Sequence, residues 1–281
     1  MQLSDRRIFA LLGEVVDGNP TEEMIQAAFV AVGLPWKYVS IPVPSGSFEA
    51  AWAAARALGF AGLNVTKPYK IEAARLADRL TPAAAAIGAV NCVYRADEGL
   101  VGDNTDGRGL VRAVAGTGRI EGASVVVLGA GGAARAVAVE LALAGAREIV
   151  VAARSEEAGR SLVEAIRATG TATARFERWA GELAIPAGCD LLVNATSVGM
   201  FDPDERPAVD LSSAGAATVV ADVVITSRPT ALLAEASGRG LATVHGNEML
   251  VRQAAIGFEL WTGREAPLPV LRAALDAALG N

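Results

Sequence analysis

The stretch SVVVLGAGGAAR, residues 124–135, decides the fold of this chain. Its four consecutive apolar residues, 125–128, predict a parallel strand buried on both faces, because such strands show an unbroken apolar run rather than alternation. A glycine turn follows at once, and Gly129, Gly131 and Ala134 fit the pattern G-x-G-x-x-G/A. The order of strand and glycine turn predicts the start of a nucleotide-binding α/β unit.

The residues after this turn predict a helix. Residues 133–144 are rich in alanine, and Gly145 ends the run. In such a unit the glycines let the backbone approach a pyrophosphate, and the free N–H groups of the helix point at it. A bare structural turn is the alternative, since the pattern alone is weak. We expect a dinucleotide to contact Gly129, Ala130, Gly131, Gly132 and Ala133.

Length and composition limit the class of protein. The 281 residues suffice for two domains, and 52% of them are hydrophobic with no apolar run of membrane-spanning length. Two cysteines and one histidine offer neither a disulfide framework nor a Cys/His zinc set, so we expect no metal and a cytoplasmic enzyme. The net charge of −6 argues against a nucleic-acid partner, and nothing points to a membrane.

Two regions of alternating strands and helices predict an α/β fold. The first region has the order βαβαβ, which predicts a parallel sheet, and a pair of strands follows around a turn at residues 97–99. Its expected strands are 8–12, 38–43, 60–65, 89–94 and 100–101, and its expected helices are 21–32, 48–58 and 69–80. The second region begins near Arg108, with strands at 124–128, 148–152, 190–193, 218–222 and 242–244. Two helices, 248–261 and 268–279, end the chain.

The second strand of the glycine-turn region indicates which dinucleotide binds. In NAD-binding units this strand usually ends in an acid that bonds the ribose hydroxyls and repels a 2′-phosphate. Here the strand runs into Arg154 and Ser155. We therefore expect NADP, with NAD possible. Arg154 would stack on the adenine or pair with the phosphate, and Ser155 would donate a hydrogen bond to it. Glu156 and Glu157 nearby leave open that Arg154 is an ordinary solvated arginine.

Lysine is rare in this chain, and its position is informative. Arginine occurs 22 times and lysine three times, at Lys37, Lys67 and Lys70. Lysine can exchange a proton near neutral pH when its surroundings shift its pKa, whereas arginine effectively cannot. The segment 67–70 is therefore a candidate for chemistry.

Three stretches of the first region concentrate polar side chains: NVTKPYK (64–70), AVNC (89–92) and GDNTDG (102–107). Lys70 should stand at the carboxyl end of the sheet, where ligands bind in open α/β folds. Each stretch taken alone could be a turn held by Asx hydrogen bonds.

These stretches, together with GAGGAAR, NATSVGM (194–200) and GNEMLVRQA (246–254), resemble shikimate dehydrogenases in order and spacing along nearly the whole chain. The resemblance implies a two-lobed enzyme in which residues 1–107 plus 245–281 bind substrate and residues 108–244 form a Rossmann domain for NADP. It implies reversible reduction of 3-dehydroshikimate to shikimate, or of a related cyclic polyol ketone, in aromatic amino acid biosynthesis. A monomer or homodimer is expected.

The resemblance also assigns roles to residues. Lys70 corresponds to the family's catalytic lysine and Asp106 to its partner. A hydride delivered to a carbonyl leaves an alkoxide, which needs a proton and a nearby positive charge. The matched substrate-binding residues are Asn64, Thr66, Asn91 and Gln253. The matched cofactor-binding residues further along the chain are Thr196, Val198, Met200, Val223 and Gly246.

Two departures from the family both fall where it holds the substrate carboxylate. The family's Ser-x-Ser-Pro is replaced within residues 17–23 (DGNPTEE), and a tyrosine is replaced by Ile225. Glu22 would repel an anion. The hypothesis is that the ring-hydroxyl end of the site is retained and the carboxylate end is remodelled, so that a quinate-like acid, a cyclitol or an amino-substituted ring becomes plausible as substrate. Thr21 and Lys67 could instead restore a carboxylate contact. Alternatively, Glu22 and Glu23 merely favour a helix start.

Two further functions compete with the dehydrogenase. A catalytically silent nucleotide-binding regulator could use the same fold, although it need not keep both Lys70 and Asp106. A serine hydrolase is disfavoured because Ser197 lacks a G-x-S-x-G context. His245, the single histidine, is expected to end a strand.

Overall fold

The computed structural model describes residues 6–97 and 99–280, which divide into two compact units. Unit 1 comprises Met1–Thr105 and Gln253–Asn281, and unit 2 comprises Asp106–Arg252. The chain passes from unit 2 back to unit 1 within helix α9 (Gly246–Thr262). Each unit has its own sheet and its own core, so each is described by itself.

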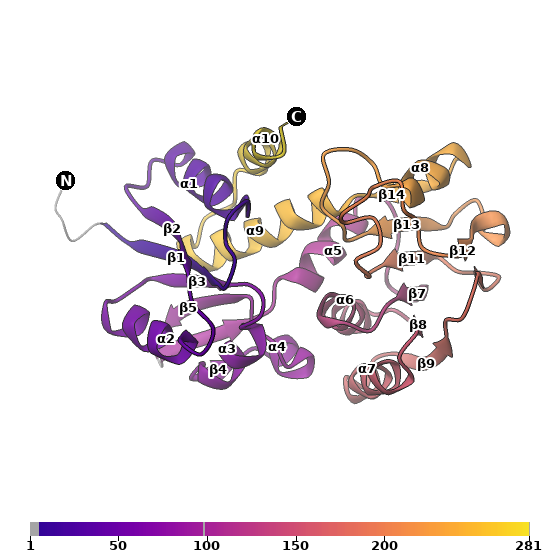
Figure 1. The fold of residues 1–281 in the computed structure, drawn as a ribbon, viewed down its shortest axis with the longest axis horizontal. Coiled ribbons are helices and arrows are strands. Elements are labelled where there is room, and N and C mark those ends of the chain that lie inside the picture. Colours follow the sequence, from indigo (N-terminus) through magenta and orange to yellow (C-terminus); the bar gives the residue numbers. More distant parts are fainter. Residues whose placement is uncertain (1–5, 98, 281) are drawn as a thin grey trace. The chain divides into compact units, whose positions relative to one another are not determined.

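Unit 1 is built on a six-stranded sheet with the order β2-β1-β3-β5-β6-β4 (Figure 1). Strands β1, β2 and β3 pair in parallel, which confirms the predicted βαβαβ unit, whereas β5 runs antiparallel to both β3 and β6. The sheet is therefore mixed. Its elements are β1 (Ile8–Gly13), α1 (Thr21–Ala31), β2 (Lys37–Pro42), α2 (Phe48–Ala57), β3 (Gly62–Val65), α3 (Lys70–Leu76), β4 (Arg79–Leu80), α4 (Pro82–Ile87), β5 (Cys92–Ala96), β6 (Gly99–Asp103) and α10 (Leu268–Ala278).

The helix predicted over 69–80 was too long at its C-terminal end. Helix α3 stops at Leu76, and Arg79–Leu80 form the short strand β4 beside β6. The carboxylate of Asp78 accepts a hydrogen bond from the backbone N–H of Leu100 at 2.7 Å and from the Arg56 guanidinium at 2.9 Å. These contacts with residues that are distant in sequence hold the backbone in an extended form. A prediction from local helix propensity cannot include such contacts.

An aromatic cluster joins the C-terminal part of α9 to this sheet. The Trp261 ring lies 5.1 Å from that of Phe9, and its indole N–H donates to the carbonyl oxygen of Val93 at 2.9 Å. A side chain at Gly62 would collide with the Trp261 ring. Since β3 leaves room only for the indole, the register of α9 on the sheet is fixed, and this sets the position of Gln253.

Unit 2 contains a six-stranded sheet in which every strand is parallel, with the order β9-β8-β7-β11-β13-β14. This is the strand order of dinucleotide-binding Rossmann folds. Its elements are α5 (Asp106–Val114), β7 (Ser124–Leu128), α6 (Gly132–Leu143), β8 (Glu148–Ala153), α7 (Glu156–Ala168), β9 (Thr173–Arg178), β10 (Leu183–Ala184), β11 (Leu191–Asn194), β12 (Val209–Asp210), the 3₁₀ turn η2 (Leu211–Ser213), β13 (Val219–Asp222), α8 (Ala231–Gly238) and β14 (Ala242–Val244).

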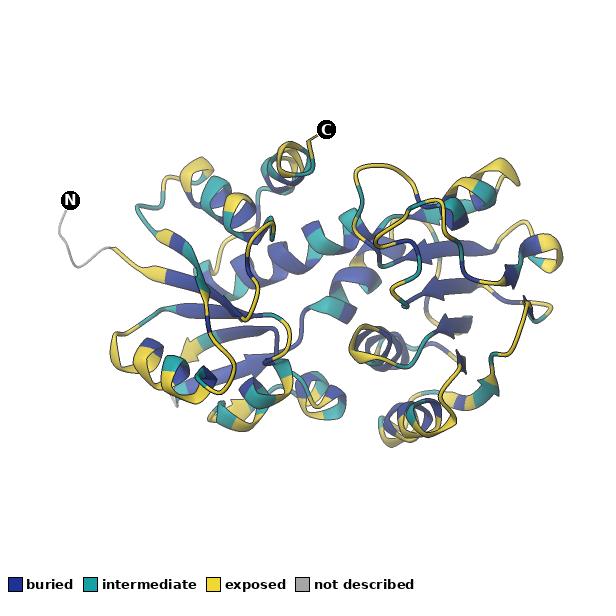
Figure 2. Ribbon diagram, viewed as in Figure 1, coloured by how far each residue is buried: buried dark blue, intermediate teal, exposed yellow. Residues whose placement is uncertain are grey.

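Strands β7, β8, β11 and β13 of the unit 2 sheet are buried on both faces, as their unbroken apolar runs predicted (Figure 2). One face packs on α6 and α7 through Val125, Val127 and Val151, and the other packs toward α8 through Val126 and Leu128. The five predicted strands are confirmed. Strands β9, β10 and β12 were not predicted, because β9 lacks the continuous apolar run of the other strands and β10 and β12 span only two residues each.

Candidate functional site

Four polar side chains in unit 1 form one buried network at the carboxyl end of β3. The Asn64 amide donates to the carbonyl oxygen of Asn91 at 3.0 Å. The side-chain oxygen of Asn91 accepts a hydrogen bond from the backbone N–H of Thr105 at 2.8 Å, and the side-chain NH₂ group of Asn91 donates to the Thr105 hydroxyl at 3.1 Å. The same amide lies 3.4 Å from the Gln253 oxygen, which also accepts from the Thr105 hydroxyl at 3.2 Å. The network thus joins all three polar stretches to helix α9.

Tyr38 completes this network from strand β2. Its hydroxyl donates to the Asn64 side-chain oxygen at 2.7 Å. Burial, followed by the nearby Cys92 and Glu22, raises the pKa of Tyr38 well above its ordinary value. The phenol therefore stays protonated and holds Asn64 in one amide orientation, with its NH₂ group on the Asn91 carbonyl.

Lys70 and Thr66 lie next to the network along the chain. Lys70 is the first residue of α3, and its carbonyl oxygen accepts from the N–H of Val90, the residue before Asn91, at 2.8 Å. Thr66 directly follows β3, and its N–H donates to Leu12 at 2.9 Å. Both side chains are half-buried at the carboxyl end of the parallel strands. Asp106 begins α5 in unit 2, one residue after Thr105.

The start of helix α1 replaces the family's serine motif. Asn19 accepts a hydrogen bond from the N–H of Thr21 at 3.0 Å, so the first N–H of the helix already has a partner. Thr21 itself is buried, and the Glu22 carboxylate accepts from the N–H of Ser40 in the edge strand β2 at 2.6 Å. Glu22 is thus half-buried and bonded, not free in solvent, whereas Glu23 is exposed.

The glycine turn of unit 2 has two kinds of glycine. Gly129 has φ +104°, and a Cβ there would press on the Ala195 carbonyl at 3.1 Å, so the fold itself requires glycine. At Gly131 and Gly132 a Cβ would meet open space, and no side chain of the described residues caps α6. Ala130 and Ala133 lie in the same turn, half-buried and exposed. No described residue requires glycine at these two positions, so the backbone of the turn is open to close approach by a ligand.

The loops after β11 and β13 are held by one buried carboxylate. Asp222 accepts from the Asn194 amide at 3.0 Å, from the Val224 N–H at 3.0 Å and from the Thr230 hydroxyl at 2.8 Å. Burial raises its pKa against these bonds. The Thr196 hydroxyl donates a hydrogen bond to the side-chain oxygen of Asn194 at 2.7 Å, so Asn194 links the segment 194–200 to Asp222.

Three further predicted cofactor residues, Val198, Met200 and Val223, lie on these same loops, and a fourth, Gly246, begins α9 two residues after β14. The backbone carbonyl oxygen of Val198 accepts a hydrogen bond from the side-chain amide of Asn194 at 3.2 Å, while Met200 is exposed. The backbone N–H of Val223 donates a hydrogen bond to the backbone carbonyl oxygen of Asn194 at 3.0 Å. Gly246 is buried, and a Cβ at this position would collide with the Val224 carbonyl. All of them follow carboxyl ends of unit 2 strands, the edge that also carries the glycine turn.

Arg154 and Ser155 follow β8 at this edge. The Ser155 hydroxyl accepts from the N–H of Ala158 at 3.3 Å and so caps α7, which leaves its proton available for an acceptor outside the helix. Arg154 is exposed, and within residues 6–97 and 99–280 no hydrogen bond or ion pair engages its guanidinium.

The structure brings Asn64, Asn91 and Gln253 into one network and places the predicted cofactor residues at one sheet edge. Sequence reasoning missed Tyr38, Thr105 and Asp222. Thr105 lies inside the quoted stretch GDNTDG, so its motif was a signal. Tyr38 stands in an apolar strand and gave none. Asp222 stands three residues before Ile225, and only the replaced tyrosine was a signal in that segment.

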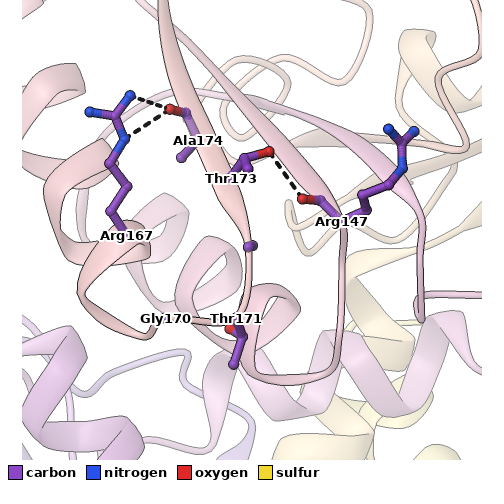
Figure 3. A pocket seen from close by; sticks show the side chains of 7 residues that line it. Arg147, Arg167, Gly170, Thr171, Thr173 and Ala174 are labelled. Atoms are coloured by element: carbon purple, nitrogen blue, oxygen red, sulfur yellow. Dashed lines mark hydrogen bonds between the residues drawn. The ribbon is translucent and has the colours of Figure 1, made fainter.

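One open hollow lies elsewhere in unit 2, with a volume of about 490 Å³, between the residues that precede β8 and β9 (Figure 3). The Arg167 guanidinium donates to the carbonyl oxygen of Ala174 at 2.7 Å, and the Thr173 hydroxyl donates to that of Arg147 at 3.1 Å. The hollow opens at the amino ends of the strands, opposite the glycine turn. Among the described residues, no cluster of His, Cys, Asp or Glu could hold a metal ion, and no helix could span a membrane.

Three family models match the chain. The shikimate dehydrogenase substrate binding domain matches residues 11–93, the shikimate / quinate 5-dehydrogenase model matches residues 111–202, and the shikimate 5′-dehydrogenase C-terminal domain matches residues 246–275. The first and third matches fall mainly on unit 1, and the second falls on unit 2.

Individual relatives extend over almost the whole chain. Shikimate dehydrogenase (NADP(+)) of Geobacter metallireducens is 41% identical, and the match covers 97% of each chain. Ligand-free 5-ketofructose reductase of Gluconobacter sp. strain CHM43 has a TM-score of 0.94 at 36% identity, covering 97% of this chain and 98% of that one. Shikimate 5-dehydrogenase of Thermus thermophilus, in complex with NADP(H) and shikimate, has a TM-score of 0.82 at 33% identity, covering 97% and 100%. The chain belongs to the shikimate dehydrogenase family.

Proposed function

We propose that this protein is an NADP-dependent oxidoreductase that reversibly reduces 3-dehydroshikimate to shikimate, or a closely related cyclic polyol ketone. The network of Asn64, Asn91, Thr105 and Gln253 carries the proposal. Its amides and hydroxyl are neutral donors and acceptors, which suit ring hydroxyl groups, and it lies beside Lys70 along the chain. Residues 1–107 plus 245–281 would bind the substrate, and residues 108–244 would bind NADP.

Lys70 is the proposed proton donor. Bound NADPH would supply the hydride to the carbonyl carbon. The ammonium group of Lys70 then stabilises the charge that develops on the carbonyl oxygen and transfers its proton there, so that the ketone becomes a secondary alcohol. In the reverse direction neutral Lys70 accepts the proton. Asp106 is its proposed partner.

The proposed cofactor site follows the carboxyl edge of the unit 2 sheet. Residues 129–133 would cradle the pyrophosphate, because α6 has no side-chain cap of its own among the described residues. Arg154 and Ser155 would bind the 2′-phosphate, and the absence of an acid at the end of β8 disfavours NAD. Residues Thr196, Val198, Met200, Val223 and Gly246 would border the nicotinamide.

Steady-state rates test this proposal directly. Purified protein should reduce NADP⁺ with shikimate and oxidise NADPH with 3-dehydroshikimate, with NAD⁺ a much poorer oxidant. Quinate and a set of cyclitols belong in the same assay, because they carry the ring hydroxyls with and without the carboxylate. Failure to turn over any ring alcohol with either cofactor would leave the silent regulator as the better account.

A second candidate is the reductase of a neutral polyhydroxy ketone. It is favoured by the start of α1, where Asn19 already occupies the first helix N–H and Glu22 adds a half-buried negative charge. A substrate carboxylate would lose a donor there and meet repulsion. One structural relative is a 5-ketofructose reductase. Turnover of 5-ketofructose with NADPH, at a kcat/KM above that for 3-dehydroshikimate, would select this candidate.

A further inference from the structure

The last residue of strand β9, Arg178, lies beside the proposed 2′-phosphate site. In the parallel pairing of β8 with β9, Arg178 is the register partner of Ala153, and Arg154 is the next residue along the chain. The N–H of Trp179 donates to the Ala153 carbonyl at 3.0 Å, so the two strands stay paired to this point. Neighbouring strands are about 4.8 Å apart, so the backbones of Arg178 and Ala153 lie one strand spacing apart, with Arg154 one residue further along.

The side chain of Arg178 lies on the face of the sheet that carries α7. Ala174 belongs to the core that α7 covers, and a Cβ on Gly159 of that helix would collide with the Phe176 ring. Side chains alternate along a strand, so residues 174, 176 and 178 share this face. Helix α7 starts at the same edge of the sheet, where Ser155 caps it. Arg178 therefore flanks the α7 N-terminus from β9, as Arg154 does from β8.

The charges around this position leave both guanidinium groups available. Arg178 and Arg154 are exposed, and in the described part of the chain neither has a hydrogen bond or an ion pair. Two of the neighbouring acids have other partners, because Glu177 pairs with Arg175 at 2.7 Å and Glu156 pairs with Arg160 at 2.7 Å, whereas Glu157 is exposed. Two unpaired arginines beside a serine hydroxyl are the groups that bind a phosphate dianion.

We infer that Arg178 binds the 2′-phosphate of NADP together with Arg154 and Ser155, and is a specificity residue for NADP over NAD. The inference rests on the proposed NADP-dependent function. A guanidinium gives two parallel N–H donors to phosphate oxygens, and a second guanidinium from the adjacent strand would neutralise the remaining charge. Nothing in this arrangement serves NAD, which carries a hydroxyl at that position.

The test uses fragments of the cofactor, so that binding is measured without turnover. Calorimetry should give an affinity for 2′,5′-ADP that falls about tenfold or more in Arg178→Ala, while the affinity for 5′-ADP changes less than about twofold. Arg175→Ala is the matched control, because it removes the same charge from the same strand on the opposite face. Arg178→Lys should regain part of the lost affinity. In kinetics, KM for NADP⁺ should rise in Arg178→Ala with little change in kcat.

The outcomes distinguish the role of Arg178 from the proposed preference for NADP. Equal affinity of Arg178→Ala and wild type for 2′,5′-ADP, with a loss in Arg154→Ala, would overturn the role of Arg178 and leave the NADP site standing. An equal loss of affinity for 2′,5′-ADP in Arg175→Ala would show that any nearby positive charge has the same effect, and this result would also overturn the role of Arg178. If the wild type itself binds 5′-ADP as tightly as 2′,5′-ADP, the proposed NADP preference fails as well.

Discussion

At the scale of single residues, the buried polar groups are paired at the strand ends, and Asp222 illustrates how. Its carboxylate joins the loops after β11 and β13 through Asn194, Val224 and Thr230. Burial raises its pKa, because the charged form loses more hydration than these three donors return. The carboxylate therefore orders the loops at a cost that depends on pH.

This cost predicts a pH dependence of stability. A carboxyl whose pKa is raised by folding stabilises the fold fully below its unfolded pKa, and this contribution is lost as the pH rises through the folded pKa. We expect the free energy of unfolding of wild type, relative to Asp222→Asn, to fall as the pH rises above about 4, the ordinary pKa of an aspartate. Urea titrations at several pH values measure it. A difference that does not change with pH would contradict the assignment.

The same scale shows what the sequence could and could not reveal. Asn64, Asn91 and Gln253 stood in quoted stretches, and the structure joins them in one hydrogen-bond network. Tyr38 could not be foreseen, because its hydroxyl bond to Asn64 spans 26 residues of sequence and depends on which face of β2 turns inward. Glu22 was expected to repel an anion or to face solvent, and its bond to the Ser40 N–H is a third arrangement that only the fold reveals.

At the scale of elements, the strands with continuous apolar runs were predictable and the polar ones were not. Strands β7 and β8 are buried on both faces, so their sequences are almost purely apolar. Strand β9 lies at the edge of the sheet and reads TARFER, in which charged and apolar residues mix. The residues of β9 do not by themselves favour a strand, and its pairing with β8 supplies the stabilisation. Strand β4 is stabilised in the same way by its pairing with β6.

The contact of α5 with α6 yields a prediction at this scale. Gly107 is buried in α5, and a Cβ there would collide with the Ala136 carbonyl and the Glu140 side chain. Alanine normally favours a helix over glycine, but here overpacking should cost about 1–3 kcal/mol. Chemical denaturation of Gly107→Ala should show this loss. Gly116→Ala, exposed just beyond the same helix, is the control and should be neutral.

At the scale of the whole molecule, the chain assigns its two units different polar groups. Unit 1 carries the amide network and Lys70, and unit 2 carries the glycine turn and the arginines that follow β8 and β9. The sequence predicted this division from its two α/β regions and from the resemblance. The exact boundary was not readable from sequence, because the division falls inside the continuous helix α9.

Hydrogen exchange read by mass spectrometry tests the division of roles. NADP⁺ should slow exchange in peptides that contain residues 129–135 and 154–158, because a bound phosphate occupies helix N–H groups. Shikimate, or the preferred ring alcohol, should slow exchange in peptides that cover 64–70 and 89–92. Protection of the glycine turn by the ring alcohol alone, with none from NADP⁺, would contradict the proposed assignment.

The central claim is that Lys70 transfers the proton in an NADPH-dependent ketone reduction, and one comparison tests it most directly. The kcat for 3-dehydroshikimate, or for the ketone the wild type prefers, is measured in wild type and Lys70→Ala, alongside the dissociation constant of NADP⁺. We expect kcat to fall by a factor of about 10² or more, since a general acid contributes that much, with NADP⁺ affinity nearly unchanged. Equal turnover by the two proteins would remove Lys70 from the mechanism and contradict the account.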